Sequence, residues 1–216
     1  QMIQAFYNDL SKPAKERPDG LSPKTVKNIH GVLHRALQQA VLVGSLRFNP
    51  AEACTLPRQE KKELVPFDDD QITAFLAAIR GNKYETLFTV TLFTGMREGE
   101  VMGLMWDCVD FENGTIMINK QLQLHERVGG GAYKLGSPKN GRSRIITPAA
   151  SVMRLLEKHR AHQAVQRLKI GEAWLNSGFV FTDELGQPLT KTGVYRSFKK
   201  AAASIGRPDA RFHDLR

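Results

Sequence analysis

The sequence has little cysteine, no long hydrophobic run and fewer acidic than basic residues. Its two cysteines, Cys54 and Cys108, form no CxxC pair and lie among apolar residues, so we expect reduced, buried thiols and no metal site. No apolar run approaches the length of a membrane span, and no signal peptide precedes the first expected helix. We therefore expect a cytoplasmic protein without a membrane partner.

The charge balance favours a polyanion as the partner. Lys and Arg number 31 against 22 Asp and Glu, which gives a net charge of +9. Charge alone would allow nucleic acid first and an anionic membrane surface second, and of these two we expect nucleic acid. Hydrophobic residues make up 41% of the chain, enough to bury a core, so a disordered chain is excluded.

Three kinds of enzyme are disfavoured because their motifs are missing or broken. Residues 136–143 nearly match a nucleotide-binding P-loop, but Arg142 stands in the lysine position, Pro138 interrupts the loop and a strand-like run follows. A metal-dependent nuclease would need several converging carboxylates, whereas the acids at 68–70 are better explained as a helix cap. A Ser/His/Asp hydrolase would need a nucleophile elbow, and the sequence has none.

Hydrophobic periodicity predicts a mainly α-helical protein with a small antiparallel β-sheet, an α+β fold. Residues 1–56 are expected to form a helical domain, and residues 67–216 a second domain. Residues 57–66 are charged and aperiodic, so we interpret them as the linker between the two domains.

One helix of the first domain separates apolar from polar residues. We expect it to begin at Ser22-Pro23 and to end at Gly44, with a further short helix starting at Asn49-Pro50. Its apolar face carries Val26, Ile29, Leu33, Leu37 and Val41, and its other faces carry Lys24, Lys27, Asn28, Arg35 and Gln38. The polar faces are either solvated surface or a surface that contacts duplex DNA, and the sequence leaves both readings open.

The second domain is expected to begin with a helix capped at Asp68 and to contain a β-hairpin. Residues 108–111 and 115–119 flank an Asn-Gly turn, and the second strand continues toward Leu124. The turn within residues 137–148 leads into a third strand. Residues 179–181 are expected to form a short buried strand.

Two later helices of this domain are basic. One spans residues 151–168, and the other begins at Thr190. The outer face of the second helix carries Lys191, Arg196, Lys199 and Lys200. The last six residues are expected to start another helix, with His213 and Arg216 one turn apart on one face.

Residues 94–101 contain the strongest candidate for a functional site. Gly95 can adopt the left-handed conformation that ends a helix, and Arg97 then stands at the start of the next helix beside free N–H groups. This arrangement suits a phosphate, and Glu100, one turn on, can hold the guanidinium. An isolated RxxE motif is better explained as a surface Arg–Glu pair than as a phosphate site. The choice between these two interpretations therefore depends on the rest of the sequence.

The remaining candidates suit phosphoryl transfer without a metal. Arg97 and Arg216 can stabilise charge on the non-bridging oxygens, while Lys139, on an expected hairpin tip, or His213 handles the proton. No cofactor is needed if a protein side chain is the nucleophile.

These motifs, in this order, resemble those of the tyrosine recombinases, or phage-type integrases, and most of all the integrases of conjugative transposons. The motifs are the stretch from Thr94 to Glu100, Lys139 with residues 142–148, and residues 213–216. The resemblance implies a helical core-binding domain followed by an integrase-like catalytic domain. It also implies site-specific recombination of double-stranded DNA through a phosphotyrosyl intermediate, by a protein that assembles as a dimer or tetramer on DNA.

The resemblance implies a role for each matching residue. Arg97 and Arg216 would clamp the scissile phosphate, Glu100 would support Arg97, Lys139 would protonate the leaving 5′ oxygen, and His213 would assist proton transfer. The residues expected to bind DNA are Lys24, Lys27, Asn28, Arg35, Arg142, Arg144, Lys191, Arg196 and Lys199.

The sequence departs from the family pattern at the nucleophile. The family places its nucleophilic tyrosine beyond the HxxR motif, where this sequence ends, and all four tyrosines, Tyr7, Tyr84, Tyr133 and Tyr195, precede that motif. We therefore expect a fragment that cannot form the covalent intermediate by itself. The alternative is a non-catalytic, integrase-like DNA-binding protein or regulator.

Overall fold

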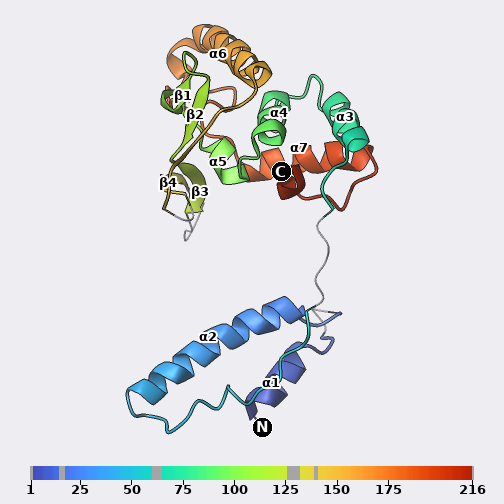
Figure 1. Ribbon diagram of the computed structural model, residues 1–216, viewed down its shortest axis with the longest axis vertical. Helices are drawn as coiled ribbons and strands as arrows, with labels where there is room; N and C mark the ends of the chain where they lie inside the picture. The colour runs from blue at the N-terminus through green and yellow to red at the C-terminus, as the bar shows by residue number, and fades with distance from the viewer. Residues whose placement is uncertain (1, 15–17, 60–64, 126–131, 139–140, 216) are drawn as a thin grey trace. The chain divides into compact units, whose positions relative to one another are not determined.

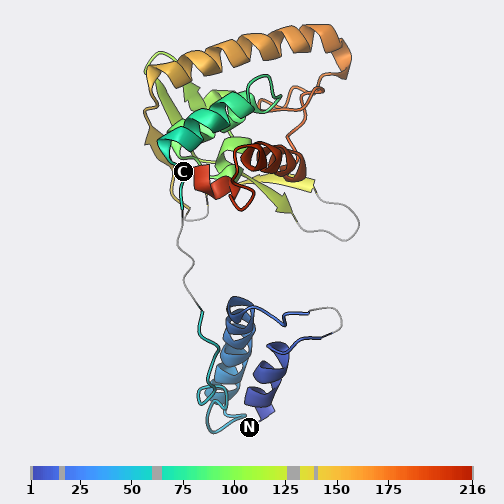
Figure 2. The same ribbon diagram turned by 90° about the vertical axis from the view of Figure 1, so that its right-hand side faces the viewer.

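The computed structural model describes residues 2–14, 18–59, 65–125, 132–138 and 141–215. The chain divides into two units, Gln1–Glu63 and Leu64–Arg216 (Figures 1 and 2). The mixture of helices with small antiparallel sheets confirms the predicted α+β class. None of the helices within the described ranges has the length and apolar character needed to cross a membrane.

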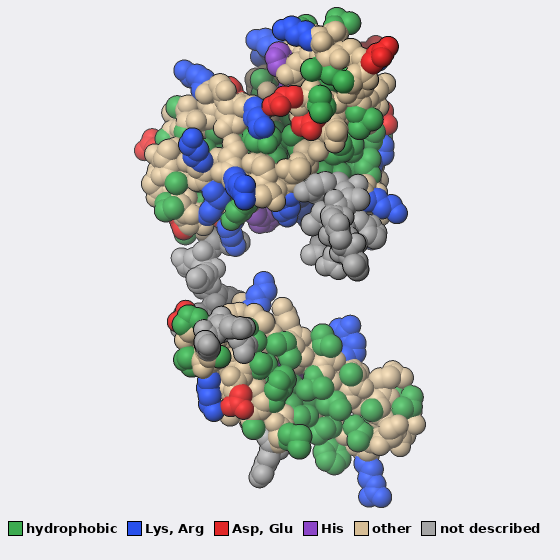
Figure 3. All heavy atoms as spheres, turned by 180° about the vertical axis from the view of Figure 1, so that it is seen from behind, with side chains coloured by type: hydrophobic (Ala, Val, Ile, Leu, Met, Phe, Trp, Pro, Cys, Tyr) green, Lys and Arg blue, Asp and Glu red, His purple; other side chains and the backbone are tan. Residues whose placement is uncertain are grey.

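The smaller unit contains α1 (Met2–Leu10) and α2 (Pro23–Leu42). The predicted start of α2 is confirmed, because the Ser22 hydroxyl accepts the N–H of Thr25 and proline follows it. Val26 of α2 and Tyr7 of α1 are buried, and the Tyr7 hydroxyl lies 3.2 Å from Nδ1 of His30 on α2. Figure 3 shows hydrophobic side chains at the surface of this unit, and the most exposed are Met2, Val32, Leu42, Val43 and Phe48.

The prediction of a helix that begins at Asn49-Pro50 is wrong. Residues 50–53 form turns, and Asn49 is buried beneath them. Its Nδ2 donates to His34 O at 3.0 Å and to Gln38 Oε1 at 3.2 Å, while its Oδ1 accepts the N–H of Ala51. The side chain that was expected to start a helix instead fastens this segment to α2.

The larger unit begins with a helix cap that the sequence predicts. Asp68 accepts the N–H of Gln71 at 2.8 Å and caps α3. The helices and 3-10 turns of this unit are α3 (Asp69–Ala78), α4 (Glu85–Thr94), α5 (Glu98–Met102), η1 (Trp106–Cys108), α6 (Ala150–Ile170), η2 (Gly171–Ala173), α7 (Lys191–Ser204) and η3 (Phe212–Leu215). The expected helix start at the end of the sequence is therefore a short 3-10 turn.

An aromatic cluster forms the centre of this unit. The ring of Phe88, from α4, lies 6.0 Å from Phe75 of α3, 6.3 Å from Phe198 of α7 and 6.1 Å from Phe212 of η3. All four side chains are buried. The cluster therefore joins elements that are far apart in the sequence and sit side by side in Figures 1 and 2.

The strands form two separate antiparallel sheets. The first has the order β1-β2-β5, from β1 (Val109–Asp110), β2 (Thr115–Ile118) and β5 (Arg144–Ile146), and the second pairs β3 (Gln121–His125) with β4 (Ala132–Gly136). The Asn-Gly hairpin and the third strand are thus confirmed. The continuation of the second strand toward Leu124 is wrong, because the chain leaves β2 after Ile118 and pairs anew with β4, a strand that sequence reasoning missed.

The short strand expected at residues 179–181 is reduced to a single bridge. Phe179 pairs with Met105, and residues 179–181 are buried as predicted. Cys108 is also buried as expected, whereas Cys54 is only half-buried.

Two glycines let α5 pack directly on β3. A Cβ atom at Gly103 would lie 2.5 Å from Leu122 N, and one at Gly99 would lie 3.1 Å from Leu122 O. The backbone of the β3–β4 hairpin therefore rests on the helix that follows Arg97.

Candidate active site

The chain turns between α4 and α5 at Gly95, and this turn places Arg97. Gly95 has the predicted left-handed conformation, with φ of 62° and ψ of 22°, and its N–H donates to Thr91 O at 2.9 Å. Met96 is fully buried and holds the turn in the core. Arg97 is extended and stands at the N-cap position of α5, so its side chain projects from the start of that helix.

Glu100 holds Arg97 from inside the protein. It is 1% exposed, its Oε2 accepts the backbone N–H of Arg97 at 2.8 Å, and its Oε1 accepts Arg97 Nη1 at 2.9 Å. The predicted contact is present, and the buried acid distinguishes it from an ordinary surface ion pair.

A second arginine binds the same carboxylate, which sequence reasoning missed. Arg144, on β5, donates from Nη1 to Glu100 Oε1 at 2.8 Å and from Nη2 to Oε2 at 2.7 Å. Burial raises the pKa of the Glu100 carboxyl, but the hydrogen bonds from Arg144 and Arg97 outweigh burial and lower it to about 2. The hydrogen bond to Glu100 also raises the pKa of the Arg144 guanidinium. The sequence placed Arg144 among the DNA-binding residues, whereas its donor fork here faces a buried acid.

Arg97 lines two clefts on the surface of the larger unit. The first is bounded by Arg97, Glu98, Gly99, Met102, Gln121, Leu122, Gln123, Lys191 and His213. The second is bounded by Thr94, Gly95, Arg97, Pro138, Arg142, Ser143 and Arg144. Three of the residues predicted from the sequence, Arg97, Lys191 and His213, thus meet at one cleft.

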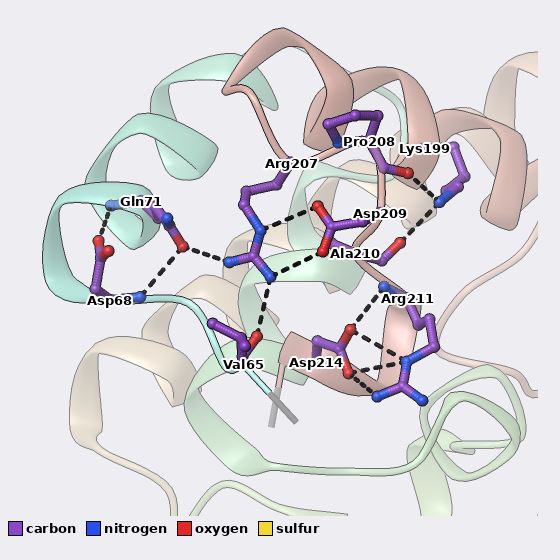
Figure 4. Close-up of polar contacts among 10 residues, drawn as sticks. All are labelled: Val65, Asp68, Gln71, Lys199, Arg207, Pro208, Asp209, Ala210, Arg211 and Asp214. Atoms are coloured by element: carbon purple, nitrogen blue, oxygen red, sulfur yellow. Dashed lines mark hydrogen bonds and ion pairs between the residues drawn. The ribbon is translucent and has the colours of Figure 1, made fainter. Parts of the chain in front are cut away.

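Two buried side chains and one ion pair hold the turn that bears His213, and Figure 4 shows the ion pair, between Arg211 and Asp214. Phe212 and Leu215 are buried, while His213 between them is exposed. Arg211 donates from Nη2 to Asp214 Oδ1 at 2.6 Å, which closes the turn. The side chain of His213 is therefore presented to the cleft from a fixed backbone.

Two cations hold the segment before this turn. Lys199 Nζ donates to the carbonyls of Pro208 and Ala210. Arg207 donates to Gln71 Oε1 at 2.7 Å and to Val65 O at 3.0 Å (Figure 4). Its guanidinium also lies over the ring of Phe67. Lys199 was predicted to bind DNA, and the structure gives its ammonium two backbone partners instead.

Comparison with known proteins identifies the architecture that carries this cleft. Residues 66–216 match the model of the phage integrase family. The chain belongs to the phage integrase family.

The relatives of this phage integrase chain are longer than the chain itself. It is 31% identical to a "Tyrosine recombinase XerC-like" protein of Caldanaerobacter subterraneus subsp. tengcongensis, over 99% of this chain and 57% of the relative. It is 24% identical to the ICEBs1 integrase of Bacillus subtilis, over 91% of this chain and 53% of the relative. The chain therefore spans little more than half the length of these curated relatives.

Solved structures share the fold of this chain. The Tn1549 transposon integrase, solved in complex with transposon right end DNA, superimposes with a TM-score of 0.75 over 91% of this chain and 65% of that one, at 23% identity. The lambda integrase bound to DNA superimposes with a TM-score of 0.63 over 89% of this chain and 62% of that one, at 16% identity. At these identities the likeness concerns the fold.

The other residues predicted from the sequence fall into three groups. Lys139 and Arg216 lie outside the described residues. Lys191 pairs with Glu98 at 2.9 Å, and Arg142 and Arg196 are exposed. The predicted DNA-binding residues of α2, which are Lys24, Lys27, Asn28 and Arg35, are all exposed.

The described part of the clefts contains neither a tyrosine nor a metal-binding cluster. Tyr7 and Tyr84 are buried elsewhere, and Tyr195 lies at the surface of α7 without lining either cleft. No three His, Cys, Asp or Glu side chains of the described ranges gather as metal ligands would.

Proposed function

We propose that this chain is part of a tyrosine-type site-specific DNA recombinase, which cuts and rejoins double-stranded DNA through a phosphotyrosyl intermediate. The observation that carries the proposal is the buried Glu100, which fixes the Arg97 guanidinium at a cleft that also contains His213. Membership of the phage integrase family supports the same chemistry.

The proposed reaction assigns a task to each candidate residue. Arg97 and Arg216 bind the non-bridging oxygens of the scissile phosphate and stabilise the charge that develops on them. A tyrosine oxygen forms a bond to phosphorus while the bond to the 5′ oxygen breaks. Lys139 gives the leaving oxygen its proton, and His213 assists proton transfer. The energy of the broken bond is kept in the phosphotyrosyl link, so rejoining needs no ATP.

The nucleophile is the part of this scheme that the described clefts do not supply. The curated relatives are nearly twice as long as the matched region, which leaves room for a tyrosine that these 216 residues do not include. We propose that such a tyrosine completes the site.

Duplex DNA is the proposed substrate, and a dimer or tetramer on DNA is the proposed working form. The exposed cations of α2 and the net charge of +9 support binding to phosphates. The relatives named for the Tn1549 transposon and ICEBs1 support a role in the integration or excision of a mobile element.

The proposal is tested by trapping the covalent intermediate. The test uses nicked duplexes that tile the DNA on both sides of the coding sequence, incubated in EDTA with residues 1–216 or with a longer protein that continues past Arg216. A denaturing gel should show a protein–DNA adduct for the longer protein, which Arg97→Ala lowers by orders of magnitude with little loss of DNA binding. An adduct with residues 1–216 alone would show that the nucleophile lies among the four tyrosines of the sequence.

Cleavage by the longer protein that disappears in EDTA would mean a metal-dependent nuclease and would refute the proposal. DNA binding without any adduct would favour the non-catalytic regulator instead.

A further inference from the structure

The Glu100 carboxylate accepts four hydrogen bonds, which fills its capacity as an acceptor. Two donors belong to Arg97, which is three residues away along the chain, and two belong to Arg144, which is 44 residues away on β5. Each oxygen accepts one bond from each arginine. The carboxylate is therefore held between the start of α5 and the edge of the three-stranded sheet.

Arg97 depends on this arrangement because both guanidinium groups use Oε1. Arg97 Nη1 lies 2.9 Å from that oxygen and Arg144 Nη1 lies 2.8 Å from it. If Arg144 were absent, a carboxylate that is 1% exposed would lose two of its four partners without gaining water. It would then take up a proton or move, and either change would release the oxygen that orients Arg97.

Arg142 provides a contrast two residues earlier in the chain. Both arginines line the second cleft, but Arg142 is exposed, and no hydrogen bond or ion pair joins it to the residues that the structure describes. The donor fork of Arg144 is already bound, and 37% of its side chain is exposed. Both arginines were predicted from the sequence to bind DNA, but in the structure the guanidinium of Arg144 is bound to Glu100 and that of Arg142 is exposed.

We propose that Arg144 is a positioning residue that fixes Glu100, and through it the guanidinium of Arg97, and that it does not contact the DNA backbone. Arg142 is the residue of this pair that binds a DNA phosphate. This inference rests on the proposed function, because a fixed Arg97 guanidinium matters only if it binds a phosphodiester.

The first experiment follows Glu100 by NMR in the full 216-residue chain without DNA. The carboxyl 13C shift of Glu100 is recorded between pH 7 and pH 4 for the wild type, Arg144→Ala, Arg144→Lys and Arg142→Ala. The charged side chains that the structure places against Glu100 are Arg97 and Arg144. The shift should stay constant in the wild type and in Arg142→Ala, and it should titrate within this range in Arg144→Ala.

The conservative variant tests the bidentate contact. Arg144→Lys keeps the charge but offers a single donor group. The pKa of Glu100 in this variant should therefore lie between its values in the wild type and in Arg144→Ala. If Arg144→Ala fails to fold, as judged by its amide spectrum, Arg144→Lys carries the test. The proposal would be overturned if the carboxyl 13C shift of Glu100 had the same pH dependence in both variants as in the wild type.

The second experiment measures duplex DNA binding at several salt concentrations. Each phosphate contact contributes about 0.9 to the slope of log K against log salt, so Arg142→Ala should lower that slope by about 0.9. Arg144→Ala should leave the slope unchanged. A loss of about 0.9 in Arg144→Ala would make Arg144 a direct phosphate contact and overturn the proposal. A wild-type chain that does not bind DNA would refute the proposed function and the role given to Arg142, but the role of Arg144 in fixing Glu100 would still be decided by the NMR result, which needs no DNA.

Discussion

Replacing Gly103 with alanine should loosen the contact between α5 and β3. Gly103 has φ of −93° and ψ of 5°, a conformation open to alanine, so the effect is one of space and not of backbone strain. The added methyl would meet Leu122 N at 2.5 Å, Gln121 C at 2.8 Å and Gly99 O at 2.9 Å, all of them backbone atoms. Overpacking of this kind costs about 1–3 kcal/mol, and the stiffer unfolded chain offsets about 0.4–1 kcal/mol of it. We expect a net loss of about 1–2 kcal/mol.

Urea unfolding followed by tryptophan fluorescence measures this loss. Trp106 and Trp174 both belong to the larger unit, so the signal reports that unit. Gly99→Ala is the graded comparison, because its methyl would meet Leu122 O at 3.1 Å, and it should change the free energy of unfolding much less. If Gly103→Ala were as stable as the wild type, the close packing of α5 on β3 described above would be incorrect.

Three further predictions use other parts of the fold. Phe88→Ala should lower the free energy of unfolding by about 3–5 kcal/mol in the same urea assay, whereas Phe93→Ala, on the same helix but 55% exposed, should change it by about 0.5 kcal/mol or less. Arg35→Ala should lower the salt slope of duplex binding by about 0.9 without a change in stability, and an unchanged affinity would argue against contact between α2 and DNA. Because the folded-state pKa of Glu100, about 2, lies below its unfolded value of roughly 4.3, the stabilisation from its charge is present above pH 4.3 and is lost as the pH falls toward 2. Glu100→Gln should therefore be less stable at pH 7 and should lose less stability than the wild type between pH 5 and pH 3, and equal pH profiles would contradict the assignment.

Features encoded by neighbouring residues could be predicted from the sequence. The Ser22 and Asp68 caps, the left-handed Gly95 and the Asn-Gly turn each depend on a few adjacent residues whose conformational preferences agree. The contact between Arg97 and Glu100 belongs to the same class, because the two residues are one helical turn apart.

Features that depend on partners far along the chain could not be predicted. Arg144 meets Glu100 only because β5 pairs with β2, and no local pattern records that pairing. Asn49 has the sequence of a helix start, but His34 O and Gln38 Oε1 on α2 accept hydrogen bonds from its Nδ2 and hold the residue against that helix. The break between β2 and β3 likewise depends on β4, because β3 pairs with β4. The residues of β4 do not by themselves predict a strand.

The contacts of Arg207 affect the choice of the first residue of a truncated protein. Val65, whose carbonyl accepts a hydrogen bond from Arg207, lies one residue before the stretch that matches the family, residues 66–216. A truncated protein that begins at residue 66 would keep every residue of the match but lose this carbonyl. It would leave Arg207 Nη2 with its longer contact to Asp209 Oδ2, at 3.4 Å, and would weaken the tie between the start of this unit and the segment that leads to His213. The boundary of the family match and the boundary of the hydrogen-bonded unit therefore differ by one residue, and Val65 belongs inside the unit.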